Sequence, residues 1–242
     1  MGYKVCLDPG HSKDIAGKCA PDKSYYEHEF ALDMANRMKR LLNAKGIQVT
    51  LTRTDTYNVT LQQRVKIANA IGGLNLFVSL HSNAAGGSGW SSAKGYVIYT
   101  SQAGDEAERN IAAKAILKRA REAGITIRNA GIAHSLFYVL RYTTAPAVLI
   151  EHGFHTNQEE VALLKTDAYR DKLAKANVAG ILDYLGVAVG SLSDDGLPPL
   201  DTAVDSLAQK GILNSPDYWK GGVYSPGNVQ ILIRKCAAAL CP

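Results

Sequence analysis

The sequence predicts an α/β fold, in which a twisted, mixed but largely parallel sheet is covered by helices on both faces, with a small all-α module after it. Two observations support this prediction. Short apolar runs alternate with helical patterns as far as residue 185, and the connections between them are short. A stretch rich in Ser, Asp, Gly and Pro then follows. We therefore predict a catalytic domain over 1–187, a linker over 188–199 and a helical module over 200–242.

Three apolar runs predict buried strands, and each one leads into a polar side chain. Residues 3–7 precede His11, residues 74–80 precede His81, and residues 145–150 precede Glu151. In open α/β sheets, ligands bind at the carboxyl ends of the strands. Each residue alone is more often structural, but three such groups together are typical of metal binding or proton transfer.

The other elements follow from periodicity and from residues that favour helix ends. A helix is predicted to begin at Glu27, with acidic residues in its first turn, and Gly46 is suited to cap the C-terminus of this helix. In the next helix we expect Leu61, Val65 and Ala68 to face inward. The full set of helices is 27–42, 60–71, 105–123, 157–164 and 167–185, with further strands at 47–52, 95–100 and 137–141. The C-terminal module should contain two short helices, within 202–209 and 229–240, which bury little surface alone.

Composition narrows the choice of partners. The chain has 242 residues, 46% of them hydrophobic, and a formal charge of +5. It contains no run long enough to span a bilayer and no clustered basic stripe, so we expect neither a membrane span nor nucleic-acid binding. The positive excess lies within 1–187, which suits an anionic wall polymer. Four cysteines, Cys6, Cys19, Cys236 and Cys241, lack the spacing of a zinc knuckle or redox pair.

The polar residues after the strands suggest a zinc site. A catalytic zinc usually has three protein ligands and one open position. His11 and His81 supply two imidazoles, and Glu27 is the nearest acid able to return to the same end of the sheet. Glu151 would then move the proton of an activated water. Glu29 is a rival ligand. Spacing alone leaves this hypothesis level with an α/β domain whose polar strand ends serve another purpose.

Several segments resemble one enzyme family. They are Val5-Cys6-Leu7-Asp8-Pro9-Gly10-His11, Glu27 with Phe30, Leu51-Thr52-Arg53, Phe77-Val78-Ser79-Leu80-His81-Ser82-Asn83-Ala84 and Ala147-Val148-Leu149-Ile150-Glu151-His152-Gly153-Phe154. Their order and content are similar to the zinc-dependent N-acetylmuramoyl-L-alanine amidases of the third amidase family, over roughly residues 3–185. Ser12 and His152 depart from the common pattern, but neither replaces a ligand.

The resemblance implies roles for individual residues. It implies that His11, Glu27 and His81 bind one zinc ion per catalytic domain and that Glu151 is the catalytic acid/base. The implied reaction is hydrolysis of the amide between N-acetylmuramic acid and L-alanine in peptidoglycan. We further predict substrate contacts for Asn83, His134 and His152, and expect His28 and His155 to lie at the surface or in the groove.

The sequence also suggests where the protein is made and acts, and which other functions it could have. Residue 3 already belongs to the first strand, without a secretory pattern before it, so we expect synthesis in the bacterial host cytoplasm without a signal peptide and action on the wall after release. A phage endolysin fits this best, with 200–242 contacting a wall polymer. The alternatives are another zinc peptidase or amidohydrolase of related fold, and an inactive wall-binding protein.

Overall fold

The computed structural model describes residues 2–15, 18–87, 89–102, 104, 107–190, 192, 207–209 and 211–213. The chain divides into two compact units, Met1–Leu192 and Ser193–Pro242. Most of the second unit lies outside the described residues, including residues 202–206 of the helix expected within 202–209 and all of the helix expected within 229–240; residues 207–209 are helical. A separate C-terminal wall-targeting module therefore stays a prediction.

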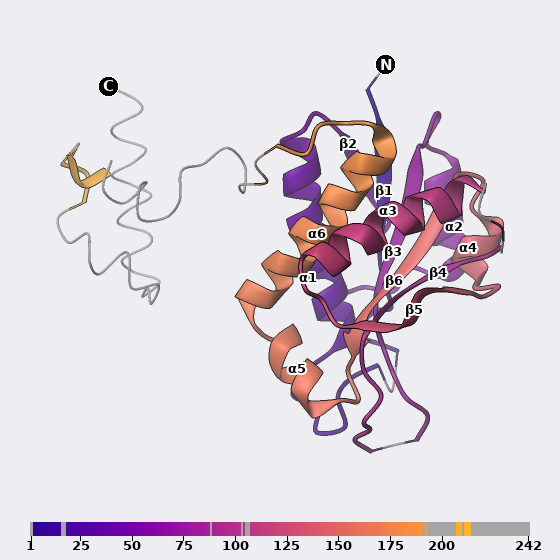
Figure 1. Cartoon of the computed structure of the whole chain (residues 1–242), viewed down its shortest axis with the longest axis vertical. Helices are drawn as coiled ribbons and strands as arrows, with labels where there is room; N and C mark the ends of the chain where they lie inside the picture. Colours follow the sequence, from indigo (N-terminus) through magenta and orange to yellow (C-terminus); the bar gives the residue numbers. More distant parts are fainter. Residues whose placement is uncertain are drawn as a thin grey trace. The chain divides into compact units, whose positions relative to one another are not determined.

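The first unit contains six strands and six helices among its described residues (Figure 1). The strands are β1 (Lys4–Pro9), β2 (Gln48–Leu51), β3 (Leu76–Asn83), β4 (Tyr96–Thr100), β5 (Ile127–His134) and β6 (Ala147–Phe154). The helices are α1 (Glu27–Asn43), α2 (Leu61–Asn69), α3 (Glu108–Glu122), α4 (Tyr138–Tyr142), α5 (Gln158–Leu164) and α6 (Asp167–Leu185).

All six strands form one sheet in the order β2-β1-β3-β6-β4-β5. Neighbouring strands are parallel except for β4 and β6, which are antiparallel. The predicted mixed, largely parallel sheet is therefore confirmed. Because β4 runs antiparallel to β6, and β5 runs parallel to β4, the carboxyl ends of β4 and β5 lie at the opposite end of the sheet from those of β1, β3 and β6.

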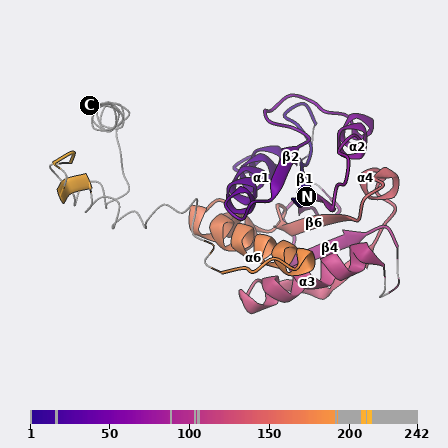
Figure 2. The same cartoon turned by 90° about the horizontal axis from the view of Figure 1, so that it is seen from above.

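Helices cover both faces of the sheet, as Figure 2 shows from above. A large core lies between the sheet and helices α1, α3 and α6, whereas a smaller core lies under α2 and α4. Two apolar faces explain why the central strands read as continuous hydrophobic runs rather than as alternating ones. The smaller face buries less of the sheet, and it is the face that leaves room for a cleft.

Strand alternation decides which face each polar side chain occupies. In β6, Val148 and Ile150 belong to the large core and Leu149 to the small one. Because side chains alternate along a strand, Glu151 faces the side of the small core and His152 the side of the large core. His81 pairs with Glu151 in the register of β3 and β6.

The same alternation acts on the two strands beside β6. In β3, Phe77 belongs to the small core, so Ser79 and His81 follow it on that face. In β1, Cys6 belongs to the small core and Asp8 follows it, paired in register with Ser79. The sheet thereby gathers a set of polar side chains on the face covered by α2 and α4.

Helix ends follow the expected chemistry. Thr60 caps α2 in a reciprocal capping box with Gln63, and the side chain of Asn157 caps α5 by accepting from the Glu160 amide. The predicted helix at 167–185 is confirmed over α6, which ends at Gly186 in a left-handed conformation, φ 68°.

Three expectations were wrong. Residues 137–141, predicted as a strand, contain most of the one-turn helix α4, whose Val139 and Leu140 fill the small core. β5 was not predicted, because Asn129 and Gly131 adopt positive φ and interrupt its alternation. Leu61 faces outward with 50% of its surface exposed. Separately, no helix among the described residues is both long enough and apolar enough to cross a bilayer.

Candidate metal centre and active-site cleft

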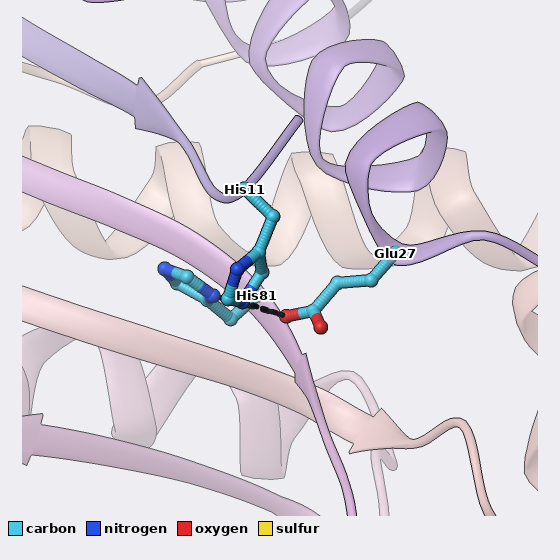
Figure 3. Close-up of side chains that lie close together, drawn as sticks. All are labelled: His11, Glu27 and His81. Atoms are coloured by element: carbon cyan, nitrogen blue, oxygen red, sulfur yellow. Dashed lines mark hydrogen bonds and ion pairs between the residues drawn. The ribbon is translucent and has the colours of Figure 1, made fainter. Parts of the chain in front are cut away.

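Three side chains from separate segments converge at the ends of β1 and β3 (Figure 3). Glu27 begins α1, His81 lies in β3, and His11 follows β1 with a left-handed φ of 54°. Gly10 packs against the His81 ring so closely that a Cβ at this position would overlap the imidazole. A glycine is thus required where the chain leaves β1, and it lets the two histidines approach each other.

Glu27 lies between the two imidazoles. Its Oε1 is 3.3 Å from His11 Nε2 and 3.0 Å from His81 Nδ1. The two rings are nearly perpendicular, with centroids 4.8 Å apart. One ligand atom from each residue lies within 4.8 Å of the others, so the three residues could hold a metal ion.

This donor set fits zinc. Two imidazole nitrogens and one carboxylate oxygen are ordinary ligands of a catalytic zinc, which keeps a fourth position open. Ligand atoms about 2.0–2.1 Å from a tetrahedral ion lie roughly 3.3 Å from one another, close to the two separations around Glu27. Glu29, the rival acid, is exposed at the surface. The arrangement of His11, Glu27 and His81 thus matches the requirements of a catalytic zinc site.

Glu27 is buried, and its charge has specific partners. Burial alone would raise its pKa, but hydrogen bonds with His11 and His81 hold the pKa below its ordinary value. The backbone N–H of Ser82 also donates to Glu27 Oε1, at 3.1 Å. Burial lowers the pKa of His11 and would also lower that of His81, but the hydrogen bond to Glu27 and the negative charge of nearby carboxylates together raise the pKa of His81. Carboxylate and neutral imidazole are the forms in which these side chains bind a metal ion.

Glu151 lies beside the cluster with an unused oxygen. Its side chain lines the same cleft as His11 and His81. Oε2 is buried and has no hydrogen-bond partner among the described residues. Burial raises the pKa of Glu151 to about 8, with His81 lowering it and Glu27 raising it further. A carboxyl group with a pKa this close to neutrality can both accept and release a proton.

A buried ion pair fixes the loop that carries His11. Arg64 Nη1 donates to Asp8 Oδ1 at 2.7 Å, and Nη2 donates to the His11 carbonyl at 2.8 Å. Burial alone would raise the pKa of Asp8, but the Arg64 charge and the hydroxyls of Ser79 and Thr52 lower it.

The cleft has a volume of about 590 Å³, within the usual range for ligand sites. Polar groups lie on its floor, and its sides are largely apolar. Leu61 and Phe137 are both exposed and belong to segments on the α2 and α4 sides, respectively. Lys18 also lines the cleft. Sequence reasoning missed Leu61, Phe137 and Lys18 as cleft residues, because nothing in their local pattern distinguishes a rim residue from an ordinary surface residue.

The structure separates the weaker candidates from the cleft. His152 is 1% exposed and lies on the opposite face, where Nδ1 is 2.9 Å from the His81 carbonyl and Nε2 is 2.8 Å from the Asn177 amide nitrogen. The prediction that it contacts substrate was wrong, and strand alternation relative to Glu151 already pointed to the other face. His28 and His155 are likewise buried rather than at the surface.

Two other residues keep distinct positions. His134 ends β5, at the sheet end opposite to Glu151, and lies 2.9 Å from the Thr100 hydroxyl through Nδ1. His134 is not among the residues that line the cleft, and its predicted substrate contact stays a prediction. Asn83 ends β3, two residues after His81, and its side chain accepts from the Ala84 amide. Its predicted substrate contact stays a prediction.

The fold and the site together define a metal-dependent hydrolase of the α/β class. A family model described as N-acetylmuramoyl-L-alanine amidase matches residues 5–183. The chain therefore belongs to the N-acetylmuramoyl-L-alanine amidase family, and within the matched region His11, Glu27 and His81 form a cluster consistent with the zinc site of such amidases.

Individual relatives agree with this assignment. The amidase LytC of Bacillus subtilis is 34% identical over 184 residues, which are 76% of this chain but only 36% of LytC. The endolysin of Bacillus phage SPP1 is 33% identical over 77% of this chain and 68% of its own length. The catalytic domain of the amidase CwlV from Bacillus (Paenibacillus) polymyxa superposes with a TM-score of 0.68 at 33% identity, over 77% of this chain and 99% of that domain.

The Arg64–Asp8 pair predicts a pH-dependent loss of stability. Arg64→Met should lower the free energy of unfolding at pH 7 by about 3–5 kcal/mol, because it leaves a buried carboxylate unpaired. In the wild type, the contribution of Asp8 is present above its ordinary pKa and is lost as the pH falls through its lowered folded-state pKa. Urea unfolding from pH 7 down to pH values below the ordinary pKa of an aspartate measures both effects.

In the variant, the pKa of Asp8 should rise, so its carboxyl is protonated on mild acidification. The deficit relative to wild type should then shrink as the pH falls. Arg141→Met, at an exposed position over Tyr142, is the matched control and should change stability by less than about 0.5 kcal/mol. A deficit that stays constant with pH would contradict this account of the ion pair.

Proposed function

We propose that His11, Glu27 and His81 hold one zinc ion and that Glu151 transfers the proton when the chain hydrolyses the amide between N-acetylmuramic acid and L-alanine. The observation that carries this assignment is the convergence of three ligand atoms, with His11 Nε2 and His81 Nδ1 on either side of Glu27 Oε1, beside the cleft that Glu151 lines. When bound, zinc supplies a Lewis acid that acidifies water and polarises the amide carbonyl.

The chain's own residues account for the proton movements. Hydrolysis adds water across the amide, so the lactyl carbon gains a hydroxyl and the L-alanine nitrogen gains a proton. Glu151, with its pKa raised to about 8 and an unpartnered Oε2, accepts the proton from the attacking water and passes it to the departing nitrogen. The pairing of Glu151 with His81 across β6 and β3 keeps the two groups side by side throughout this transfer.

The setting of the whole protein is a further part of the proposal. We propose that it is a phage endolysin, made in the host cytoplasm and acting on the wall after release. The support is the similarity to the SPP1 phage endolysin over 68% of that protein's length. Bacterial wall amidases such as LytC match about as well, so a bacterial autolysin is the alternative that the same similarity leaves open.

We also propose that residues 200–242 contact a wall polymer. They begin just after the boundary between the two units of the chain, and they carry Tyr218 and Trp219, aromatic residues suited to stacking on sugars. The second unit would then bind the cell wall and keep the catalytic unit close to its substrate.

Replacing the proposed acid/base should separate metal binding from catalysis. Glu151→Gln should retain zinc but lower kcat by about 10²–10⁴-fold, whereas His11→Ala should lose both zinc and activity. Zinc content by mass spectrometry, together with turbidity loss of wall suspensions, measures the two effects. For wild type, mass spectrometry of the products should find intact glycan and free peptides that begin with L-alanine.

Different outcomes would identify different errors. A fully active Glu151→Gln variant would show that the proton carrier is another residue. Cleavage within the stem peptide, with L-alanine still attached to the glycan, would replace the amidase assignment by a peptidase.

The proposed wall contact can be tested in the Glu151→Gln background, in which the wall is not digested. The full chain should sediment with purified cell wall, and a chain ending at residue 192 should sediment at least several-fold less. The same truncation of the active protein should hydrolyse small soluble substrates at an unchanged rate. Equal sedimentation of the two chains would refute a role for the second unit in wall binding.

A further inference from the structure

A chain of hydrogen bonds runs from His81 away from the ligand cluster and into the sheet. Ser79 Oγ lies 3.0 Å from His81 Nε2 and donates to Asp8 Oδ2 at 2.6 Å. Ser79 is fully buried and Asp8 is 1% exposed. Solvent therefore has little access to the Ser79–Asp8 hydrogen bond, and protein groups set its direction.

The direction of these bonds follows from counting protons. Arg64 Nη1 and the Thr52 hydroxyl both donate to Asp8 Oδ1, at 2.7 Å and 2.5 Å, so Asp8 is an ionised carboxylate that only accepts. A serine hydroxyl has one proton. Because Ser79 gives that proton to Asp8, it can only accept from His81, whose Nε2 must then carry a hydrogen.

This assignment determines the other nitrogen of His81. A neutral imidazole protonated at Nε2 has its lone pair at Nδ1. Nδ1 faces Glu27 Oε1 at 3.0 Å. In the metal-free protein a second proton, on Nδ1, can occupy the space between these two atoms, as in the hydrogen bond described above. When that proton is absent, both atoms direct lone pairs at the same point, which is the arrangement that two ligands of one metal ion adopt.

We infer that Ser79 is a positioning residue, which transmits the fixed charge of Asp8 to His81 and holds the imidazole in the tautomer and orientation that presents Nδ1 to zinc. The inference rests on the proposed metal site and adds a residue that touches neither the metal ion nor the substrate. Hydrogen-bond partners of metal-bound histidines generally fix the ring in this way, and their loss typically weakens metal binding by about 10–100-fold.

The protein contains a second residue, Thr52, that serves as a matched control for the role of Ser79. Thr52 and Ser79 each donate one hydroxyl to the same Asp8 carboxylate, and both are buried. Only Ser79 also contacts His81. Thr52→Val and Ser79→Ala should therefore perturb Asp8 and the fold in similar ways, but only Ser79→Ala removes the acceptor for His81 Nε2–H.

Zinc affinity, measured by competition with a fluorescent chelator, should distinguish the two variants. Ser79→Ala should weaken zinc binding by about 10–100-fold, and Thr52→Val should change it by less than about threefold. Ser79→Thr, which keeps the hydroxyl, should restore most of the affinity. Equal losses in the two hydroxyl deletions, or no loss in Ser79→Ala, would overturn the inference.

A spectroscopic measurement tests the tautomer directly. Nitrogen-15 NMR of the His81 ring in the zinc-loaded wild type should show a protonated Nε2 and a metal-bound Nδ1. A metal-bound Nε2 would overturn the inference while leaving the metal site itself intact. Failure of the wild type to bind zinc at all would overturn the proposed function, and the positioning role with it, so the two failures are distinguishable.

Discussion

The arrangement of this domain depends on one buried carboxylate. Glu27 is 2% exposed, yet it is ionised, because two imidazoles and the Ser82 amide surround it. A buried charge without such partners would cost several kcal/mol. The start of α1, the loop after β1 and the strand β3 must therefore come together for Glu27 to be tolerated, and a metal ion bound by the three side chains would take the place of the protons that link them.

The two faces of the sheet have different roles, one in stability and one in forming the site. The large core under α1, α3 and α6 supplies most of the apolar burial, so the central strands are rigid. The face under α2 and α4 has a small core. The same face carries four polar side chains of the site: Asp8 from β1, Ser79 and His81 from β3, and Glu151 from β6. A site built on strands whose other face is well packed holds its geometry more closely than a site on loops.

Much of this could be predicted from the sequence, for identifiable reasons. Buried parallel strands are long apolar runs, and the charged residue that follows each run indicates where the site lies, so His11, His81 and Glu151 could be singled out. Choosing Glu27 rather than Glu29 required the resemblance to a family, because both acids lie in the first turn of the same helix. The sheet type followed from alternation and short connections.

The rest depended on tertiary context. β5 contains left-handed residues and lies at the sheet edge, so its pattern is irregular. The residues of α4 include aromatic and β-branched types that favour strands, but the small core selects one helical turn. His152 could have been excluded, since it is one residue from Glu151 in a strand. Ser79 could have been included, since it is two residues from His81.

The most direct test of this account is anomalous diffraction at the zinc absorption edge from crystals of the zinc-loaded protein. The account predicts one strong peak in the cleft, about 2.0–2.2 Å from a nitrogen of His11, a nitrogen of His81 and an oxygen of Glu27, with Glu151 facing its open side. A peak elsewhere in the domain, or one that contacts the histidines while Glu27 points away, would contradict it.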